Sequence, residues 1–309
     1  MHVFRTLTPS KGNSAVALGN FDGLHIGHQK VISLALGGTP KGLLPTVFTF
    51  AENPLADLAG KAGGRLLTQD EKISFLQRMG VQQLYIVDFP SVRDLSAEEF
   101  VNQVLVGCLK AQKVCCGFNF TFGRGGGADS TTLTELCRAR NVEVSVAPAV
   151  LLDGMPVSST RIRRLLMDGC VEDATRLLGR PFGYEMPVLH GKRLGRSLGT
   201  PTLNQQLPQG FILPKFGVYV SRVQIGNKSW FGVTNIGVRP TVGADRPISE
   251  TWMPDYCGDE LYGQAVRVEL LSFLRPECKF STVEELRRAI VHDGEQARAI
   301  FNKTQPLGG

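Results

Sequence analysis

The chain has 309 residues, of which 42% are hydrophobic and 20% charged, and its net charge at neutral pH is +6. These values exclude a disordered tail, a coiled coil and a small disulfide-stapled protein, and at roughly 150 residues per domain the length predicts two domains. Its 35 glycines and 17 prolines exceed the ordinary share, which predicts many turns and places where the backbone approaches a ligand closely.

The cysteines and the N-terminus indicate the compartment. Seven cysteines are present, an odd number, and none has the C-x-x-C spacing of a zinc or redox site. The first residues lack the charged-then-apolar layout of a signal peptide, and no apolar run approaches the ~18 residues that cross a bilayer. We therefore expect a cytoplasmic protein with reduced thiols and no membrane partner.

Up to about residue 180, strand-like apolar runs alternate with amphipathic segments. The strand-like runs are 15–18, 46–50, 83–87, 113–117 and 142–147. Capping-box sequences at Thr68 and Ser96 mark two helix starts, and helices predicted over 160–168 and 172–178 each stop at a glycine. This alternation predicts an α/β, doubly wound, Rossmann-like domain with a parallel sheet covered on both faces.

After residue 180 the pattern changes to strands joined by turns alone. The expected strands are 217–225, 228–237, 249–253 and 265–274, and a terminal helix begins with a capping box at Thr282. Strands without crossover helices predict an antiparallel β-barrel carrying that helix. We therefore divide the chain into domains at 1–182 and 183–309.

The clearest local motif is Gly19-Asn-Phe-Asp-Gly-Leu-His-Ile-Gly-His28, in which a strand enters a glycine-rich turn before a helix. His25 and His28 are three residues apart, so at a helix start both imidazoles lie near one side. Free amides and the positive end of the helix dipole point the same way, which favours a phosphate site. The alternative is a pair of ordinary surface histidines.

A second motif, Val157-Ser-Ser-Thr-Arg-Ile-Arg163, opens a later helix. The hydroxyls of Ser159 and Thr160 and the guanidinium of Arg163 are suitable ligands for ATP phosphates and for departing pyrophosphate. Taken alone, the motif would be a plain helix cap. Paired with the two histidines it indicates a nucleotide site, whereas an aminoacyl-tRNA synthetase would need a lysine-rich loop that is absent.

The stretch from Cys116 to Ala128 contains a G-x-G-x-x-A match at Gly123. A dinucleotide fingerprint connects the first strand of a domain to its helix, and this match lies deep inside the domain, so we interpret it as a loop. Within the same stretch, Asn119 is a candidate nucleotide ligand or a turn cap.

From Met186 to Ala244 the sequence contains no Asp or Glu, which suits a polyphosphate or, alternatively, a surface balanced by later acidic residues. Its glycine-rich part holds candidate phosphate ligands, namely Gly191, Lys192, Gly195 and Arg196. Thr202 and Asn204 follow with a hydroxyl and an amide oxygen, which are hard donors suited to Mg²⁺. The alternative is a glycine hairpin followed by a turn.

Twelve motifs in order across both halves resemble the family of bacterial bifunctional riboflavin kinases/FMN adenylyltransferases, also called FAD synthetases. They are GNFDGLHIGH, LTQDEKISFLQRMGV, LSAEEF, GFNFTFG, VSSTRIR, LLGRPF, HGKRLGRSLGTPTLN, FGVYV, VTNIGVRPTVG, SET, DELYG and KFSTVEEL. The resemblance implies an N-terminal nucleotidyltransferase domain and a C-terminal kinase barrel. It also implies riboflavin, FMN and ATP as ligands, Mg²⁺ as cofactor, and no nucleic-acid partner.

By position, the resemblance assigns ATP binding at the adenylyltransferase site to Gly19, Phe21, His25, His28, Asn119, Ser159, Thr160 and Arg163. It implies a catalytic role for His28, and it makes Glu250 the base that takes a proton from the flavin's terminal hydroxyl. Gly195, Thr202 and Asn204 would hold Mg-ATP in the kinase.

Two departures leave an alternative open. The segment Ala51-Glu52-Asn53-Pro54 lacks a histidine that many relatives carry, so a kinase-only protein with a nucleotide-sensing first half is a second reading. Pro254 follows closely after Glu250 and would end strand pairing, so Asp245, Asp255 and Asp259 remain rival acids for the role of the base.

A third and weaker interpretation of the whole chain is an RNA-binding protein that uses the acid-free stretch.

Overall fold

A computed structural model describes residues 1–52, 64–190, 202–239 and 246–304. Contacts divide it into two units, the first made of Met1–Ala62 and Leu67–Ser159 and the second of Gly63–Leu66 and Thr160–Gly309. The division expected between residues 182 and 183 stays a prediction.

The first unit contains a parallel sheet with the strand order β1-β4-β3-β2-β5-β8. These strands are β1 (His2–Phe4), β2 (Ser14–Leu18), β3 (Leu44–Phe50), β4 (Gln83–Val87), β5 (Ala111–Gly117) and β8 (Glu143–Ala147). The five predicted strands are confirmed. The short edge strand β1 was not predicted, because three residues show no useful periodicity.

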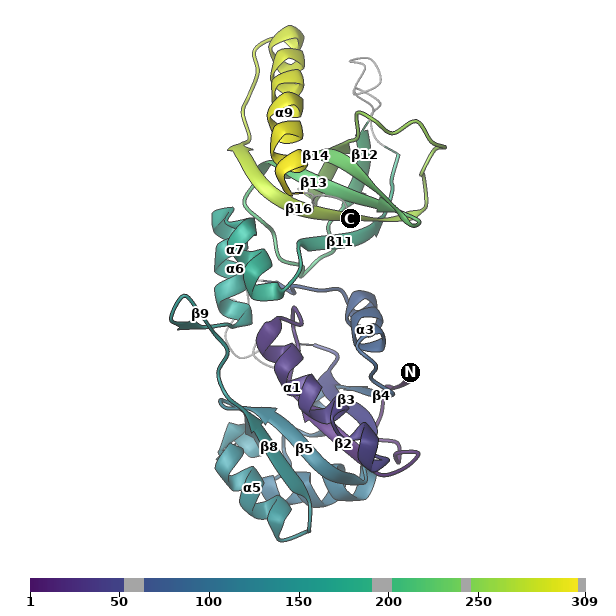
Figure 1. Cartoon of the computed structure of the whole chain (residues 1–309), viewed down its shortest axis with the longest axis vertical. Coiled ribbons are helices and arrows are strands. Elements are labelled where there is room, and N and C mark those ends of the chain that lie inside the picture. Colours follow the sequence, from purple (N-terminus) through teal and green to yellow (C-terminus); the bar gives the residue numbers. More distant parts are fainter. Residues whose placement is uncertain (53–63, 191–201, 240–245, 305–309) are drawn as a thin grey trace. The chain divides into compact units, whose positions relative to one another are not determined.

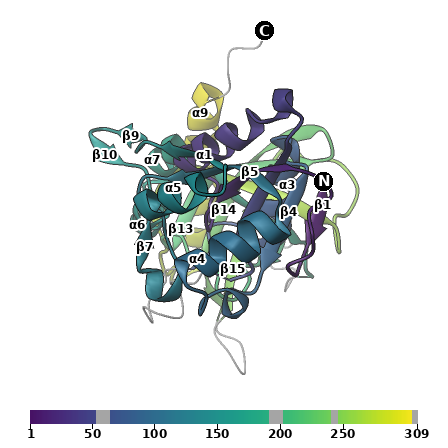
Figure 2. The ribbon, with the colours of Figure 1, turned by 90° about the horizontal axis from the view of Figure 1, so that it is seen from below.

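Helices cover both faces of this sheet because side chains alternate along each strand (Figures 1 and 2). On β2, Ala15 and Ala17 face a core shared with α1 (Ile26–Leu36) and α3 (Gln69–Arg78). Val16 and Leu18 face the opposite core, formed with a π-helix (Phe100–Cys108) and α5 (Ser130–Arg138). The doubly wound architecture is therefore confirmed.

Local signals placed the helix starts correctly. Thr68 and Ser96 each form a reciprocal capping box, with Glu71 and Glu99 respectively. The helix expected after Ser96 is a single α-helical turn, α4 (Ala97–Glu99), that widens into the π-helix. Its last bond runs from the amide of Leu109 to the carbonyl of Val104.

Short elements complete the first unit. The glycine-rich stretch forms a small hairpin of β6 (Thr121–Phe122) and β7 (Ala128–Asp129) around a 3₁₀ turn (Arg124–Gly126). It does not join a strand of the main sheet to a helix, so the dinucleotide match is accidental. The other short elements are a hairpin of β9 (Leu151–Leu152) and β10 (Met155–Pro156) and 3₁₀ turns at Thr39–Lys41 and Phe89–Ser91.

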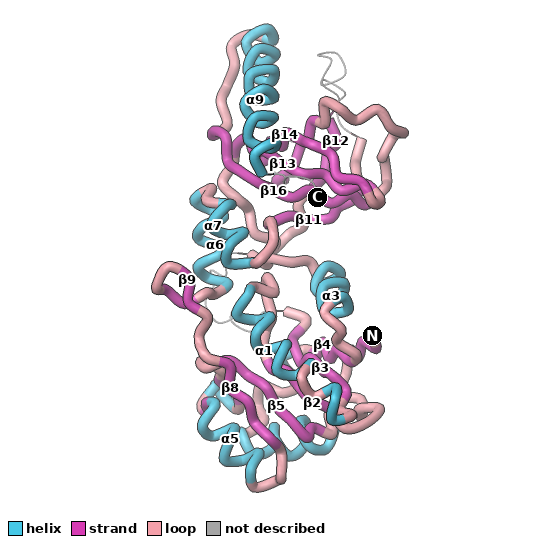
Figure 3. The backbone as a smooth tube through the Cα atoms, viewed as in Figure 1, coloured by secondary structure: helices cyan, strands magenta, loops and turns pink. Residues whose placement is uncertain are grey.

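The second unit combines two helices, an antiparallel sheet and a long C-terminal helix (Figure 3). The helices α6 (Ser159–Asp168) and α7 (Val171–Leu178) are each followed by a glycine in left-handed conformation. The sheet order is β11-β16-β13-β14-β15-β12, with β11 (Phe182–Pro187), β12 (Thr202–Gln206), β13 (Gly217–Ile225), β14 (Lys228–Arg239), β15 (Arg246–Trp252) and β16 (Ala265–Pro276). The four expected strands and the terminal helix, α9 (Val283–Thr304), are confirmed, whereas β11 and β12 were missed.

The antiparallel sheet curls until its two edge strands meet. The amide of Leu189, just after β11, donates a 2.7 Å hydrogen bond to the carbonyl of Asn204 on β12. The buried Gln205 amide crosses the same seam and donates to the carbonyls of Met186 and Val266, at 2.7 Å each. The predicted antiparallel barrel is thus confirmed.

The two faces of the barrel differ in chemistry. The inner face carries buried hydroxyls: Thr234 bonds both Ser221 and Thr251, and Tyr184 donates to Ser249. The outer face is apolar where Phe231, Val233, Val218 and Val220 meet Ala297 and Phe301 of α9. Consecutive residues of β14 therefore point alternately inward and toward the α9 side.

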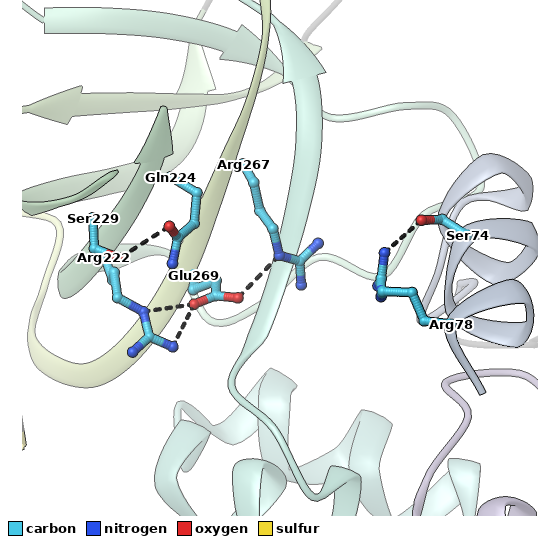
Figure 4. A network of polar contacts seen from close by, with 7 residues as sticks. All are labelled: Ser74, Arg78, Arg222, Gln224, Ser229, Arg267 and Glu269. Atoms are coloured by element: carbon cyan, nitrogen blue, oxygen red, sulfur yellow. Dashed lines mark hydrogen bonds and ion pairs between the residues drawn. The ribbon is translucent and has the colours of Figure 1, made fainter. Parts of the chain in front are cut away.

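Two cations of the acid-free stretch have structural partners. The Arg222 guanidinium forms two hydrogen bonds with the buried Glu269 carboxylate, whose other oxygen accepts from Arg267 (Figure 4). The Lys215 ammonium lies 4.7 Å from the centre of the Phe273 ring. For Arg222 the balanced-surface reading holds, because its partner is an acidic residue from beyond the acid-free stretch, whereas Lys215 packs on an aromatic ring.

Candidate active sites

The first site lies where the order of the parallel sheet reverses. Strand β2 has β3 on one side and β5 on the other, and doubly wound sheets bind ligands outside the carboxyl ends of the strands at such a point. The chain leaving β2 runs through Gly19 to His28, and the chain leaving β5 carries the exposed Asn119. The topology therefore brings both predicted segments to one edge of the sheet.

The two histidines form one unit at the start of α1. His25 is the N-cap, and its Nδ1 accepts a 3.2 Å hydrogen bond from the amide of His28. Their rings stack with centroids 3.6 Å apart, and Phe21 meets the His28 ring edge-on at 5.4 Å. The predicted placement of both imidazoles on one side of the helix start is confirmed.

Glycines make room for these rings. A Cβ at Gly27 would lie 3.2 Å from two atoms of the His25 ring, and a Cβ at Gly19 would lie 3.1 Å from the Phe21 ring. Phe21 also has a positive φ of 50°, an unusual conformation for a bulky residue. The turn therefore holds a strained, closely packed arrangement, as ligand sites often do.

His28 is neutral at physiological pH. Burial, then the neighbouring His25, then Lys72, hold the pKa of the His28 imidazole well below its usual range. Its Nδ1 is buried and has no hydrogen-bond partner among the described residues. A neutral ring with an unused polar atom is able to donate or accept one hydrogen bond from a ligand.

The second motif is tied to the first by one hydrogen bond. Ser159, the first residue of α6, donates from its hydroxyl to the carbonyl of Asp22 in the turn after β2, at 2.8 Å. Thr160 follows on the same helix and is exposed, and Arg163 is one turn further along. Arg163 donates from Nε to the carbonyl of Gly64, so that nitrogen has a structural partner. The nucleotide roles of Thr160 and Arg163 stay predictions.

Sequence reasoning missed Lys72, on α3. This lysine is buried, with 9% of its surface exposed, and its ammonium donates a 2.9 Å hydrogen bond to the carbonyl of Asn20. The Thr49 hydroxyl donates to the same carbonyl, also at 2.9 Å. Lys72 thus fixes the turn that carries the histidines, and no local signal marks it, because its partner lies on a distant strand end.

The residues predicted for a kinase site meet on the outer face of the barrel. Strand register places Glu250 of β15 opposite Asn204 of β12 on one side and Asn235 of β14 on the other. Since Thr234 points inward, its neighbour Asn235 faces outward, on the side of Phe231. The two predicted residues, Asn204 and Glu250, are therefore neighbours, and Asn235 is a third polar residue that the sequence did not single out.

The side chains of Thr202 and Asn204 fit a magnesium ion. The Asn204 amide nitrogen lies 3.1 Å from the Thr202 carbonyl and 3.5 Å from its hydroxyl. The Asn204 Oδ1 is buried and has no hydrogen-bond partner among the described residues. An orphaned carbonyl oxygen beside a hydroxyl is the hard donor set that Mg²⁺ prefers.

One of the rival acids has another partner for its carboxylate. Asp255 forms a bidentate ion pair with Arg298 of α9, which lowers the pKa of the carboxyl. Asp259 is exposed, and its backbone carbonyl, rather than its carboxylate, accepts from the Tyr256 hydroxyl, so it stays a rival acid. As expected from Pro254, β15 ends at Trp252, after Glu250. Of the predicted residues, Gly191, Lys192, Gly195 and Arg196 lie outside the described residues, as do Asn53, Pro54 and Asp245.

A doubly wound nucleotide site and a barrel with a carboxylate beside hydroxyl and amide donors together define an ATP-dependent transferase with two centres. Comparison with known proteins agrees: a family model described as FAD synthetase matches residues 7–161, and one described as riboflavin kinase matches residues 178–301. The chain belongs to the family of bifunctional riboflavin kinases/FMN adenylyltransferases.

Relatives of that name match over about 95% of the chain. One from Pseudomonas fluorescens is 37% identical, with 95% of each chain covered, and one from Listeria monocytogenes is 33% identical, covering 95% of this chain and 94% of the relative. A crystal structure titled macrolide-efflux protein, from Streptococcus pneumoniae, has 29% identity and a TM-score of 0.86 over 96% of this chain and 99% of that one.

Within the part of the chain that the structure describes, none of the helices combines the length and apolar character needed to span a membrane.

Proposed function

We propose that the chain phosphorylates riboflavin to FMN with ATP in its barrel and adenylylates FMN to FAD with a second ATP in its first unit, releasing pyrophosphate. The observation that carries this proposal is the presence of two separate polar sites in one chain. One is the stacked His25–His28 pair at a helix start, and the other is Glu250 between two asparagines.

In the adenylyltransferase the residues bind and orient ATP and form no covalent bond with it. The free amides at the start of α1 and the imidazoles of His25 and His28 would donate hydrogen bonds to the phosphates. The FMN phosphate then attacks the α-phosphorus in line, and charge develops on the departing pyrophosphate. Gly19, Phe21, Asn119, Ser159, Thr160 and Arg163 would complete the ATP site.

In the kinase, Glu250 would accept the proton of riboflavin's terminal hydroxyl as that oxygen attacks the γ-phosphorus. Thr202 and Asn204 would hold Mg²⁺, which supplies charge neutralisation on the nucleotide phosphates when bound. Gly191, Lys192, Gly195 and Arg196 would contribute to the phosphate loop. The half-buried position of Glu250 between Asn204 and Asn235 is compatible with orienting an alcohol.

Incubating the purified chain with riboflavin, ATP and Mg²⁺ and separating the flavins chromatographically tests this proposal. FMN followed by FAD is expected. Absence of both products overturns the proposal, and FMN alone would select a kinase with an inactive first half. The match of the FAD synthetase family to residues 7–161 favours two activities.

Two variants separate the sites. His28→Ala should stop the reaction at FMN, whereas Glu250→Ala should block FMN formation yet still convert added FMN to FAD. If either folded variant lost both steps, the assignment of one reaction to each site would be wrong.

We also propose a cytoplasmic location, supported by seven cysteines that are all free thiols.

A further inference from the structure

We propose that Glu277 and Asn235 form a polyol-binding part of the kinase site, which holds hydroxyl groups of the flavin's ribityl chain beside Glu250. This inference rests on the kinase half of the proposed function and adds residues that bind the acceptor. It follows from the packing of Glu277 against β14.

Glu277 lies directly on the backbone of β14. A Cβ built at Gly237 would overlap the Glu277 carboxylate, so this contact exists only because residue 237 is glycine. Gly237 follows Asn235 by two residues and therefore shares its outward face. The glycine thus admits an acidic side chain to the face that carries Asn204 and Glu250.

Asn235 connects this carboxylate to the proposed base. Its Nδ2 donates a 3.3 Å hydrogen bond to Oε1 of Glu277, and strand register sets the same residue opposite Glu250. Directly opposed residues in an antiparallel pair have Cβ atoms roughly 5 Å apart, and residues i and i+2 on one strand are roughly 7 Å apart. Glu250, Asn235 and the Glu277 carboxylate at Gly237 therefore occupy successive neighbouring positions on one face, and each is within reach of hydroxyls on a polyol bound along that face.

The end of β16 sets the position of Glu277. Two residues earlier, Arg275 forms a bidentate ion pair with the buried Asp293 of α9, with distances of 2.8 and 2.6 Å. This pair attaches the strand end to the helix, so Glu277 leaves the strand at a defined point. The side chain itself stays exposed.

The Glu277 carboxylate has unused capacity to accept hydrogen bonds. Among the described residues it forms no ion pair, and its hydrogen bond from Asn235 is long. A carboxylate accepts strong, charge-assisted hydrogen bonds from hydroxyls, and it repels phosphates. The chemistry therefore favours the hydroxyl-rich chain of the acceptor over the ATP phosphates as its ligand.

Kinetic measurements on two variants test the proposal. Glu277→Gln keeps the shape of the side chain and removes its charge, and Gly237→Ala displaces the carboxylate from β14. Each should raise the KM for riboflavin, and the Kd for riboflavin measured by its fluorescence without ATP, by about tenfold, while the KM for ATP stays within twofold. Conversion of added FMN to FAD in the same preparation should be unchanged.

Glu295→Gln, an exposed carboxylate of α9 outside this path, is the matched control and should leave all constants unaltered. The proposal is overturned if Glu277→Gln leaves the Kd and the KM for riboflavin unchanged. It is also overturned if the KM for ATP rises as much as the KM for riboflavin. A wild-type chain that makes no FMN would instead overturn the proposed kinase function itself, so the two failures are distinguishable.

Discussion

The hydroxyl of Ser159 donates a 2.8 Å hydrogen bond to the carbonyl of Asp22, so the second predicted nucleotide motif is attached to the first across more than a hundred residues of sequence. Asp22 is buried and lies three residues before the His25 cap, in a turn with positive φ angles at Phe21, Gly23 and Leu24. The hydrogen bond therefore helps to hold the turn that positions both histidines.

Removing this hydrogen bond should weaken the adenylyltransferase selectively. Ser159→Ala removes the hydrogen bond to the Asp22 carbonyl, which costs about 1 kcal/mol, and we expect FAD formation from FMN to fall about fivefold while FMN formation is unchanged. Product chromatography measures both steps. Ser33→Ala, which removes a hydroxyl bonded only within α1, is the control, and a similar loss in that variant would contradict the prediction.

A methyl group at position 27 should disturb the histidine pair. In Gly27→Ala the new Cβ would lie 3.2 Å from the His25 ring, so the ring must shift and its hydrogen bond with the His28 amide weakens. We expect FAD formation to drop about tenfold at unchanged kinase activity. The matched control is Gly37→Ala at the other end of α1, where φ is −62° and alanine fits. Full activity in Gly27→Ala would show that the ring position is unimportant.

The buried imidazole of His28 should make stability depend on pH. Its pKa is lowered in the fold, chiefly by burial, whereas the unfolded chain titrates near ~6.5. Below that pH the unfolded state binds more protons, so stability is complete above ~6.5 and falls by up to about 1.4 kcal/mol per pH unit until the folded pKa is reached.

Urea unfolding at pH 7.0 and 5.5 measures this effect. The midpoint of wild type should fall more than that of His28→Gln, which has no imidazole to protonate. His292→Gln, at an exposed histidine, should behave as wild type. Equal shifts in wild type and His28→Gln would mean that other groups account for the acid sensitivity.

The contact between Gly294 and Trp252 should make the terminal helix intolerant of a larger residue at position 294. A Cβ at Gly294 would lie 2.7 Å from Cζ3 of the Trp252 ring. Helix propensity alone favours alanine by about 1 kcal/mol, but overpacking costs about 1–3 kcal/mol, so we expect Gly294→Ala to be less stable and poorer as a kinase. Thermal denaturation measures the first effect and FMN formation the second.

Adding Trp252→Phe to Gly294→Ala should recover part of the loss, because the smaller ring leaves space for the methyl group. A gain in stability for Gly294→Ala alone would contradict the expected clash. Conversion of FMN to FAD should stay near wild type in both variants, since the substitutions lie in the barrel unit.

Local patterns predicted most of the elements. The capping boxes at Thr68 and Ser96 act within four residues, and apolar alternation in runs such as 83–87 and 217–225 is readable without any partner. Strands β11 and β12 were missed because their polar and proline residues hide the alternation. Their pairing, with β16 and β15, supplies the stability that their own composition does not.

By itself the sequence determined the order of elements, the two fold classes and the motifs at His25–His28, Ser159 and Thr202–Asn204. Only the tertiary structure decided which of these meet: Ser159 with Asp22, Lys72 with Asn20, Glu250 with Asn204 and Asn235, and Glu277 with Gly237. The physical reason is the distance along the chain over which each kind of signal acts. Caps and periodicity depend on neighbours within a few residues, whereas register and the room left by a glycine depend on chain segments that only folding brings together.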